Sequence, residues 1–299
     1  MLLSTVVLLH VLIAAPAAAQ DRPAPVPQTD QTVPVSRGMR LAIENDAGEV
    51  IVHTWDKDAL RVQARHNART RINIRTSVNV VNLSASGPTG SVDYDITAPA
   101  WMPMNIEGQF NYVAVEGAQS DVSIETVRGD IVLKGGSGSI TARTIEGEIQ
   151  VEGARGTINL SSVNQGIRVT GASGDIAAET TNGSITFTRM GSKTVQAATI
   201  NGNVSYEGTL ADNGRYTFTT HNGDIVMTVP ETSNATFNVR TYNGEFGSSL
   251  PLKGPGRSEV KRGKRTSYTL GTGSADVEME SFGGAIRVRR TGAARTSRD

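Results

Sequence analysis

Scattered acidic side chains are the first residues in this chain that could carry chemistry. A polysaccharide hydrolase needs two carboxylates at a defined separation, and a lyase needs such a pair or calcium beside a basic residue. Asp130, Glu148, Asp175 and Glu179 show no such pairing and fit solvated turns and an outer face. No Gly-x-Ser-x-Gly elbow, phosphate loop or dinucleotide fingerprint occurs. The sequence therefore predicts no catalytic residue.

Residues that bind metals are equally sparse. Cysteine is absent, which excludes disulfides, thiolate metal sites and cysteine nucleophiles. The four histidines, His10, His53, His66 and His221, lack metal-ligand spacing. The segment GGSGSIT at 135–141 matches the glycines of calcium-binding β-rolls but has no aspartate, and calcium needs several converging carboxylate oxygens. We therefore expect neither a metal nor a cofactor.

An adhesion tripeptide, Arg128-Gly129-Asp130, is the next candidate. Its slot in the sequence is filled elsewhere by Glu146-Gly147-Glu148, Asn182-Gly183-Ser184 and Asn222-Gly223-Asp224. Glycine recurs and its polar flanks vary, as is usual in solvated turns. We interpret the tripeptide as one turn of a repeat, with Gly129 structural and Arg128 and Asp130 replaceable.

Basic side chains gather in two places. One group surrounds residue 262 and comprises Lys253, Arg257, Lys261, Arg262, Lys264 and Arg265; the other comprises Arg61, Arg65, Arg69, Arg71 and Arg75. Such patches can hold anionic glycans, lipid headgroups or an acidic partner, or they can protect loops and sheet edges. Net charge is zero, so no overall field favours nucleic acid. Candidate contacts to an anionic ligand are Lys261, Arg262, Lys264 and Arg265.

A repeat must position these side chains. Isoleucine recurs at every ninth position from Ile131 to Ile185, and glycine precedes most of these isoleucines by two residues. Apolar residues alternate within each unit, which indicates short strands with one buried face, and the glycines would supply the positive φ of sharp turns. The structural residues are Gly129, Gly147, Gly183, Gly202, Gly223, Gly244, Ile131, Ile149, Ile167 and Ile185.

A hydroxyl residue starts every second unit and sets the coil length. It stands at Thr126, Thr144, Ser162, Thr180, Thr199, Thr220, Thr241 and Ser281, with steps of 18, 18, 18, 19, 21, 21 and 40. The last step is either two coils or one coil with an insertion. This pattern predicts an all-β fold, a two-sided parallel β-solenoid (β-helix) of about 18–21 residues per coil, in which Asn182, Asn201, Asn222 and Asn243 form an amide column. An antiparallel meander or barrel with Asn-Gly hairpins explains the turns but not the columns.

Less regular segments flank the coils. Residues 37–290 are predicted to form the solenoid, with 37–115 as a cap of longer strands and 116–290 as the repeat coils. Residues 258–270 suggest a hairpin that turns at Arg262-Gly263, and the tail 291–299 is predicted to be disordered.

The first residues suggest export. Residues 1–19 are apolar and end in Ala17-Ala18-Ala19, which favours a signal peptide cleaved before Gln20, although a retained anchor is the alternative. Residues 20–36 carry four prolines and are predicted to be an extended linker. No second hydrophobic span follows, so the mature chain is expected to be soluble in the periplasm, at the cell surface or in the medium.

Three stretches together suggest a family. They are NDAGEVIVHTWDKDALRVQA at 45–64, the NG-[DSE]-I coils, and GSADVEMESFGGAIRVRR at 273–290. From Val35 to Arg290 the chain resembles the bacterial putative-adhesin domain family, a domain of unknown function that is also similar to head-GIN domains. The resemblance implies an exported β-solenoid and brings no catalytic residues.

The functional hypotheses follow from this combination. The first is an exported, non-enzymatic binding, adhesion or structural module at the cell envelope, with an envelope polysaccharide or protein as partner. The second is a carbohydrate-active β-helix enzyme, either a lyase or a hydrolase, which a groove with two or three carboxylates would favour. The third is a purely structural envelope protein without a specific ligand.

Overall fold

The computed structural model describes residues 28–87, 91–255 and 262–292. Its 24 strands form one continuous sheet that coils upon itself, and no helix occurs in these ranges. The predicted signal peptide, the first part of the predicted linker and residues 293–299 of the predicted tail lie outside the described residues. Residues 291 and 292 are described, and the Thr291 amide donates to the Val229 carbonyl oxygen at 3.0 Å.

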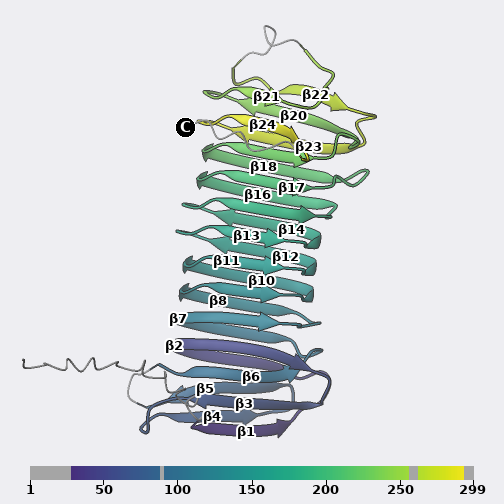
Figure 1. Cartoon of the computed structure of the whole chain (residues 1–299). Helices are drawn as coiled ribbons and strands as arrows, with labels where there is room; N and C mark the ends of the chain where they lie inside the picture. The colour runs from purple at the N-terminus through teal and green to yellow at the C-terminus, as the bar shows by residue number, and fades with distance from the viewer. Residues whose placement is uncertain (1–27, 88–90, 256–261, 293–299) are drawn as a thin grey trace, which may run out of the picture.

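Two walls of parallel strands enclose the core, and each wall gains one strand per coil (Figure 1). The first wall contains β8 (Val122–Arg128), β10 (Ser137–Glu146), β12 (Arg155–Ser162), β14 (Ser173–Thr180), β16 (Thr194–Asn201) and β18 (Arg215–Asn222). The second wall contains β9 (Ile131–Lys134), β11 (Ile149–Glu152), β13 (Ile167–Thr170), β15 (Ile185–Met190), β17 (Val204–Gly208) and β19 (Ile225–Val229).

The register of the stack places like above like. Ile149 pairs with Ile131 below it and with Ile167 above it. Equivalent side chains of the turn are 18 residues apart in the first coils and 19 and 21 residues apart in later ones. Because these ladders are parallel, the predicted two-sided solenoid is confirmed and the antiparallel alternative is excluded.

Isoleucine and aromatic side chains fill the core. The predicted Ile131, Ile149, Ile167 and Ile185 are each at most 1% exposed, and each contributes roughly 1.5–3 kcal/mol by burial. The same column continues as Val204, Ile225 and Ile286. Beside it Phe187, Tyr206 and Phe218 pack in the core with ring centroids 5.6 to 6.4 Å apart. The inner column therefore runs without a break through the described coils.

The hydroxyl column satisfies backbone groups of the neighbouring coil. The Thr199 hydroxyl donates to the Gly183 carbonyl oxygen at 2.9 Å, and the Thr220 hydroxyl donates to the Gly202 carbonyl oxygen at 2.8 Å. Both threonines are buried. A buried carbonyl without a partner is costly, which explains why Ser or Thr recurs once per coil.

The glycines of this turn are needed for close stacking rather than for positive φ. Of the six predicted repeat glycines, only Gly129 has a positive φ, at +136°. A Cβ on Gly202 would lie 2.0 Å from the Gly183 carbonyl oxygen, and one on Gly223 would lie 1.9 Å from the Gly202 carbonyl oxygen. The predicted reason is therefore wrong for the other five, because backbone of the adjacent coil occupies the space of a side chain. It holds in the other turn of the coil, where Gly138, Gly156 and Gly174 have φ of +106° to +109°.

The predicted asparagine column forms, but it includes Asn164 and does not continue to Asn243. Amide hydrogen bonds join Asn164 to Asn182, Asn182 to Asn201 and Asn201 to Asn222 at 2.8 to 3.2 Å. Asn243 was predicted to continue this column, but Gly283 of the C-terminal coil lies next to this turn and donates its amide to the His221 carbonyl oxygen.

Asn243 is displaced because the C-terminal strands do not stack in the order in which they occur along the chain. The strands there are β20 (Ala235–Thr241), β21 (Phe246–Ser248), β22 (Thr266–Leu270), β23 (Ala275–Ser281) and β24 (Ile286–Arg290). β23 lies between β18 and β20, and β24 lies between β19 and β21 (Figure 1). The last coil in sequence is therefore the second-to-last in the stack. The step of 40 residues arises because β20 and β21 do not stack directly on β18 and β19. They leave a gap of one coil, which β23 and β24 later occupy.

β22 closes the first wall. It pairs antiparallel with β20, with Phe237 opposite Tyr268. The other arm of the predicted 258–270 hairpin includes residues 258–261, which lie outside the described residues. The partner that the structure assigns to β22 is thus a strand some thirty residues earlier in the chain.

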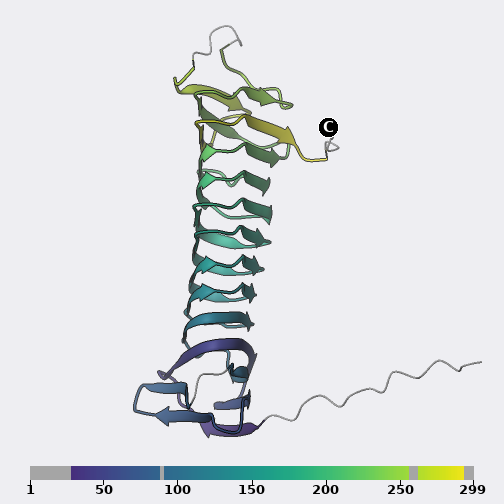
Figure 2. The same cartoon turned by 90° about the vertical axis from the view of Figure 1, so that its left-hand side faces the viewer.

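Seven strands close the opposite end (Figure 2), and the predicted greater length holds only for two of them, β2 with 16 residues and β7 with 13. They are β1 (Thr29–Pro34), β2 (Arg40–Trp55), β3 (Ala59–Arg65), β4 (Arg71–Thr76), β5 (Val80–Ser86), β6 (Asp93–Pro99) and β7 (Met104–Glu116). β2 and β7 run through both walls, and antiparallel pairs β1–β3, β3–β6 and β4–β5 cover the end. The predicted linker 20–36 therefore ends in an ordered edge strand, where Pro34 is tolerated.

One buried hydroxyl in this cap provides a test of the packing. Tyr94 is 1% exposed, and its hydroxyl has no hydrogen-bond partner among the described residues. We expect Tyr94→Phe to raise the free energy of unfolding by about 1 kcal/mol, because it removes an unsatisfied buried group. Chemical denaturation of both proteins measures the difference.

The same substitution should change the response to alkaline pH. Burial raises the pKa of Tyr94, so above pH of about 10 the unfolded chain loses this proton while the folded chain keeps it. The unfolded state then binds fewer protons, and the wild type should lose about 1.4 kcal/mol per pH unit from this position. The phenylalanine variant should not, so a difference between the two proteins that stays constant from pH 8 to 11 would contradict the assignment.

Candidate functional site

An exposed row of side chains follows the buried hydroxyl column along one edge of the stack. Each member comes directly after a column Ser or Thr and points to solvent because strand side chains alternate. We call this row the turn-edge ladder, and its members in stack order are Val127, Ile145, Val163, Thr181, Ile200, His221, Phe282 and Tyr242. Ile145, Ile200 and Phe282 are 46%, 50% and 42% exposed, which is unusual for side chains of this size.

Aromatic rings form the C-terminal part of the ladder. The ring centroids of His221 and Phe282 lie 4.7 Å apart with planes only 5° from parallel, and Tyr242 lies 5.1 Å from Phe282. The Arg240 guanidinium lies 4.9 Å from the Tyr242 ring centroid. These rings are neighbours because the C-terminal coil places Phe282 between the other two.

A shallow groove of about 640 Å³ runs beside the ladder over several coils. Its apolar side is Val163, Ile200, Tyr242 and Phe282, and its polar side comes from the column that precedes the buried hydroxyls, namely Ser161, Glu179, Thr219 and Glu280. Glu280 approaches Arg240 at 3.6 Å. The groove thus combines apolar side chains with carboxylates and hydroxyls.

Two of the acidic candidates, Asp130 and Glu148, bond neighbouring coils. The Asp130 carboxylate accepts a hydrogen bond from the Glu148 amide of the next coil at 2.8 Å, and Glu148 pairs with Arg168 at 3.0 Å. Within the described residues no group of three or more His, Asp or Glu side chains is arranged to hold a metal ion. Of the four acids that the sequence suggested, only Glu179 lines the groove.

The Arg-Gly-Asp tripeptide is part of the stack. The Arg128 guanidinium pairs with Glu146 at 2.6 Å and lies 5.6 Å from the Phe110 ring centroid. Because the Asp130 side chain also bonds the next coil, both flanks make contacts that a solvated turn would lack. The tripeptide is a coil turn as predicted, but its flanks are more constrained than the sequence suggested.

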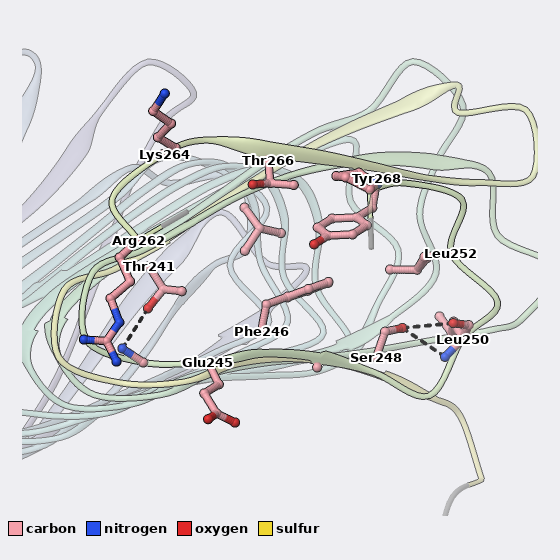
Figure 3. Close-up of a pocket in the computed structure, with 14 residues that line it drawn as sticks. Thr241, Glu245, Phe246, Ser248, Leu250, Leu252, Arg262, Lys264, Thr266 and Tyr268 are labelled. Carbon is pink, nitrogen blue, oxygen red and sulfur yellow. Dashed lines mark hydrogen bonds between the residues drawn. The ribbon is translucent and has the colours of Figure 1, made fainter. Parts of the chain in front are cut away.

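The predicted anionic-ligand contacts are divided in the structure. Arg262 and Lys264 line a second cavity at the C-terminal end (Figure 3). Arg265 pairs with Glu278, and Lys261 lies outside the described residues. In the other basic stretch Arg61 binds Asp30 at 2.6 Å and lowers the pKa of that carboxyl through this hydrogen bond.

Sequence reasoning missed the ladder and its groove. The available signal was the residue after each column hydroxyl, which is apolar or aromatic in most coils although it faces solvent.

No helix long and apolar enough to cross a membrane is found in the part of the chain that the structure describes.

Comparisons with known proteins place the chain. The model of the Toastrack DUF4097 family matches residues 40–289. A crystal structure described as a putative cell adhesion protein from Clostridium sporogenes is 11% identical, with 88% of this chain and 99% of that chain covered and a TM-score of 0.23. So low a score supports no argument about function. No curated protein matches. The match to the family model covers most of the chain and confirms the resemblance seen in the motifs: the chain belongs to the Toastrack DUF4097 family.

Proposed function

We propose that the protein is an exported, non-enzymatic binding module of the cell envelope and that the turn-edge ladder holds an extended polysaccharide. The observation that carries this proposal is the turn-edge ladder, in which five of the eight members are exposed apolar side chains (Val127, Ile145, Val163, Ile200 and Phe282), and the last three of these line the groove. Monomeric proteins rarely expose a contiguous apolar row, and such a row usually marks an interaction site. The apolar run at residues 1–19 is the support for export.

The chemistry of the groove favours a carbohydrate. Phe282 and Tyr242 offer apolar ring edges to the C–H groups of sugar rings, because their faces pack on His221, on Arg240 and on each other. Groups such as Glu179 and Thr219 can bond sugar hydroxyls. The carboxylates disfavour a polyanion, so the expected ligand is neutral or carries amino groups. A repeating polymer also matches a surface that repeats at the strand spacing of about 4.8 Å.

The stack holds this surface rigid before any ligand arrives. Each ladder residue follows a buried hydroxyl that is bonded to the neighbouring coil, for example Thr199 before Ile200 and Thr220 before His221. Because little ordering is required on binding, weak contacts along the groove can add up.

A carbohydrate-active enzyme is the second candidate, since Glu179 and Glu280 share the groove. They belong to one column, in which Glu179 pairs with Ala198, Ala198 with Thr219, and Thr219 with Glu280. Three strand spacings separate their backbones by about 14 Å. Glycosidase carboxylates lie about 5–9.5 Å apart, so this spacing favours binding over hydrolysis.

Pull-down on insoluble glycans tests the proposal. We expect one or more of cellulose, chitin and peptidoglycan sacculi to retain the protein, and the double variant Phe282→Ala/Tyr242→Ala to bind at least about tenfold more weakly, which corresponds to about 1.4 kcal/mol. Phe110→Ala is the control, because Phe110 is an exposed aromatic residue, at 52% against 42% for Phe282, and lies outside the ladder.

Three results would count against this function. The wild type could bind none of the glycans, the folded double variant could bind as well as the wild type, or Phe110→Ala could weaken binding equally. Release of soluble sugar that Glu179→Gln abolishes would instead favour the enzyme.

A further inference from the structure

Among the described residues, the two walls of the solenoid end unequally at its C-terminal end. β22 adds a strand to the first wall beyond β20, whereas the second wall ends at β21, which pairs with β24. Between the unequal walls lies a cavity of about 450 Å³ (Figure 3). This volume falls within the range of about 300–1,000 Å³ that is typical of small-molecule sites.

The inner surface of this end cavity continues the apolar core. Phe246 pairs in register with the buried core residue Ile286. Its ring stacks on Tyr268 with centroids 4.5 Å apart, and Leu250 and Leu252 line the cavity beyond them. Figure 3 shows the two aromatic rings in the middle, the leucines at one end and Arg262 at the other.

Some polar side chains of the cavity have no partner among the described residues, although Thr241 and Ser248 do. Tyr268 is only 8% exposed, its hydroxyl points into the cavity, and no hydrogen bond joins it to any described residue (Figure 3). Burial raises the pKa of Tyr268, so this hydroxyl stays a neutral donor. Arg262 and Lys264 form no ion pair within the described ranges. Glu245 also belongs to the lining, but its carboxylate points outward in Figure 3.

We propose that the end cavity binds a medium-chain aliphatic carboxylate. The carboxylate would pair with the Arg262 guanidinium, which suits it in a bidentate geometry, and would accept a hydrogen bond from the Tyr268 hydroxyl. The hydrocarbon chain would lie against Phe246, Leu250 and Leu252. The Arg262 cation at one end of the cavity and the leucines at the other match the charged head and the apolar tail of such a ligand. This site is independent of the turn-edge ladder.

Calorimetric titration of the protein with decanoate tests this site. We expect saturable binding with one decanoate per chain, about tenfold weaker binding for Arg262→Gln, and severalfold weaker binding for Tyr268→Phe, which keeps the ring stacking. Decanol, which has the same chain without the charge, should bind at least about tenfold more weakly than decanoate. Arg215→Gln is the matched control, because Arg215 is an exposed arginine outside every cavity described above.

Defined outcomes would overturn the proposal. They are no saturable binding of decanoate, equal affinity for decanol, or unchanged affinity in both cavity variants when their melting temperatures match the wild type. Binding of anionic phospholipid vesicles without binding of decanoate would also reject it, since it would assign the basic residues to a lipid surface. Loss of glycan binding in the ladder variants with decanoate binding retained would support two separate sites.

Discussion

Ile149→Asp is expected to prevent cooperative folding of the coils, whereas Ile145→Asp only four residues earlier is expected to leave the fold intact. Ile149 is fully buried and stacks between Ile131 and Ile167. An aspartate there loses the packing of the isoleucine and places a carboxylate among apolar side chains without a partner. The combined cost is about 5 kcal/mol or more, a large part of the 5–15 kcal/mol that stabilises a typical domain.

Ile145 provides a closely matched control. It is 46% exposed on the turn-edge ladder, so the same substitution there should change stability by no more than about 0.5 kcal/mol. Circular dichroism with urea denaturation compares the two variants. If Ile149→Asp unfolded with the wild-type midpoint, the buried isoleucine column would not be the support of the fold.

Gly202→Ala is expected to destabilise the stack by about 3 kcal/mol or more, although alanine is the smallest possible replacement. A Cβ at this position would lie 2.0 Å from the Gly183 carbonyl oxygen. That oxygen is backbone, and it also accepts the Thr199 hydroxyl at 2.9 Å. Relief therefore requires two coils to move apart and to lose hydrogen bonds, which places the cost at or above the upper end for overpacking.

Gly191→Ala separates this clash from the general effect of replacing glycine. Gly191 has no positive φ, and a Cβ there would meet nothing within 4 Å. That variant should be neutral or stabilised by up to about 1 kcal/mol, because alanine restricts the unfolded chain. Thermal melts of both variants give the comparison. Equal melting temperatures would show that the coils tolerate a side chain at the stacked glycine.

The C-terminal exchange shows where repeat-based reasoning stops. Tyr216 of β18 and Phe237 of β20 both pair with Val277 of β23. Both strands therefore present the same register to a neighbour, and direct stacking of β20 on β18 would also match the repeat. The sequence period determines the register between stacked strands. It does not determine which of two coils with the same register lies next to β18 and β19.

The predicted contacts to an anionic ligand are separated in the structure. Arg262 and Lys264 were expected to meet an anion, and the structure places both at the end cavity, but Arg265 is paired with Glu278. Tyr268 and Phe246 were not foreseen as cavity residues, because a core column looks the same in sequence whether the next level is filled or empty.

By itself, the sequence determined the parallel coils, their length, the buried isoleucines and the hydroxyl column, because stacking like above like leaves a period that can be read directly. Tertiary structure alone decided that Phe282 lies between His221 and Tyr242, that backbone of the next coil occupies the space of a side chain at Gly202, and that Tyr268 lines a cavity. These three features depend on contacts between segments that are distant in the sequence. The order of such segments along the chain does not determine their order in space. A local sequence pattern indicates which face of a strand is buried. It does not indicate which strand or side chain packs against that face.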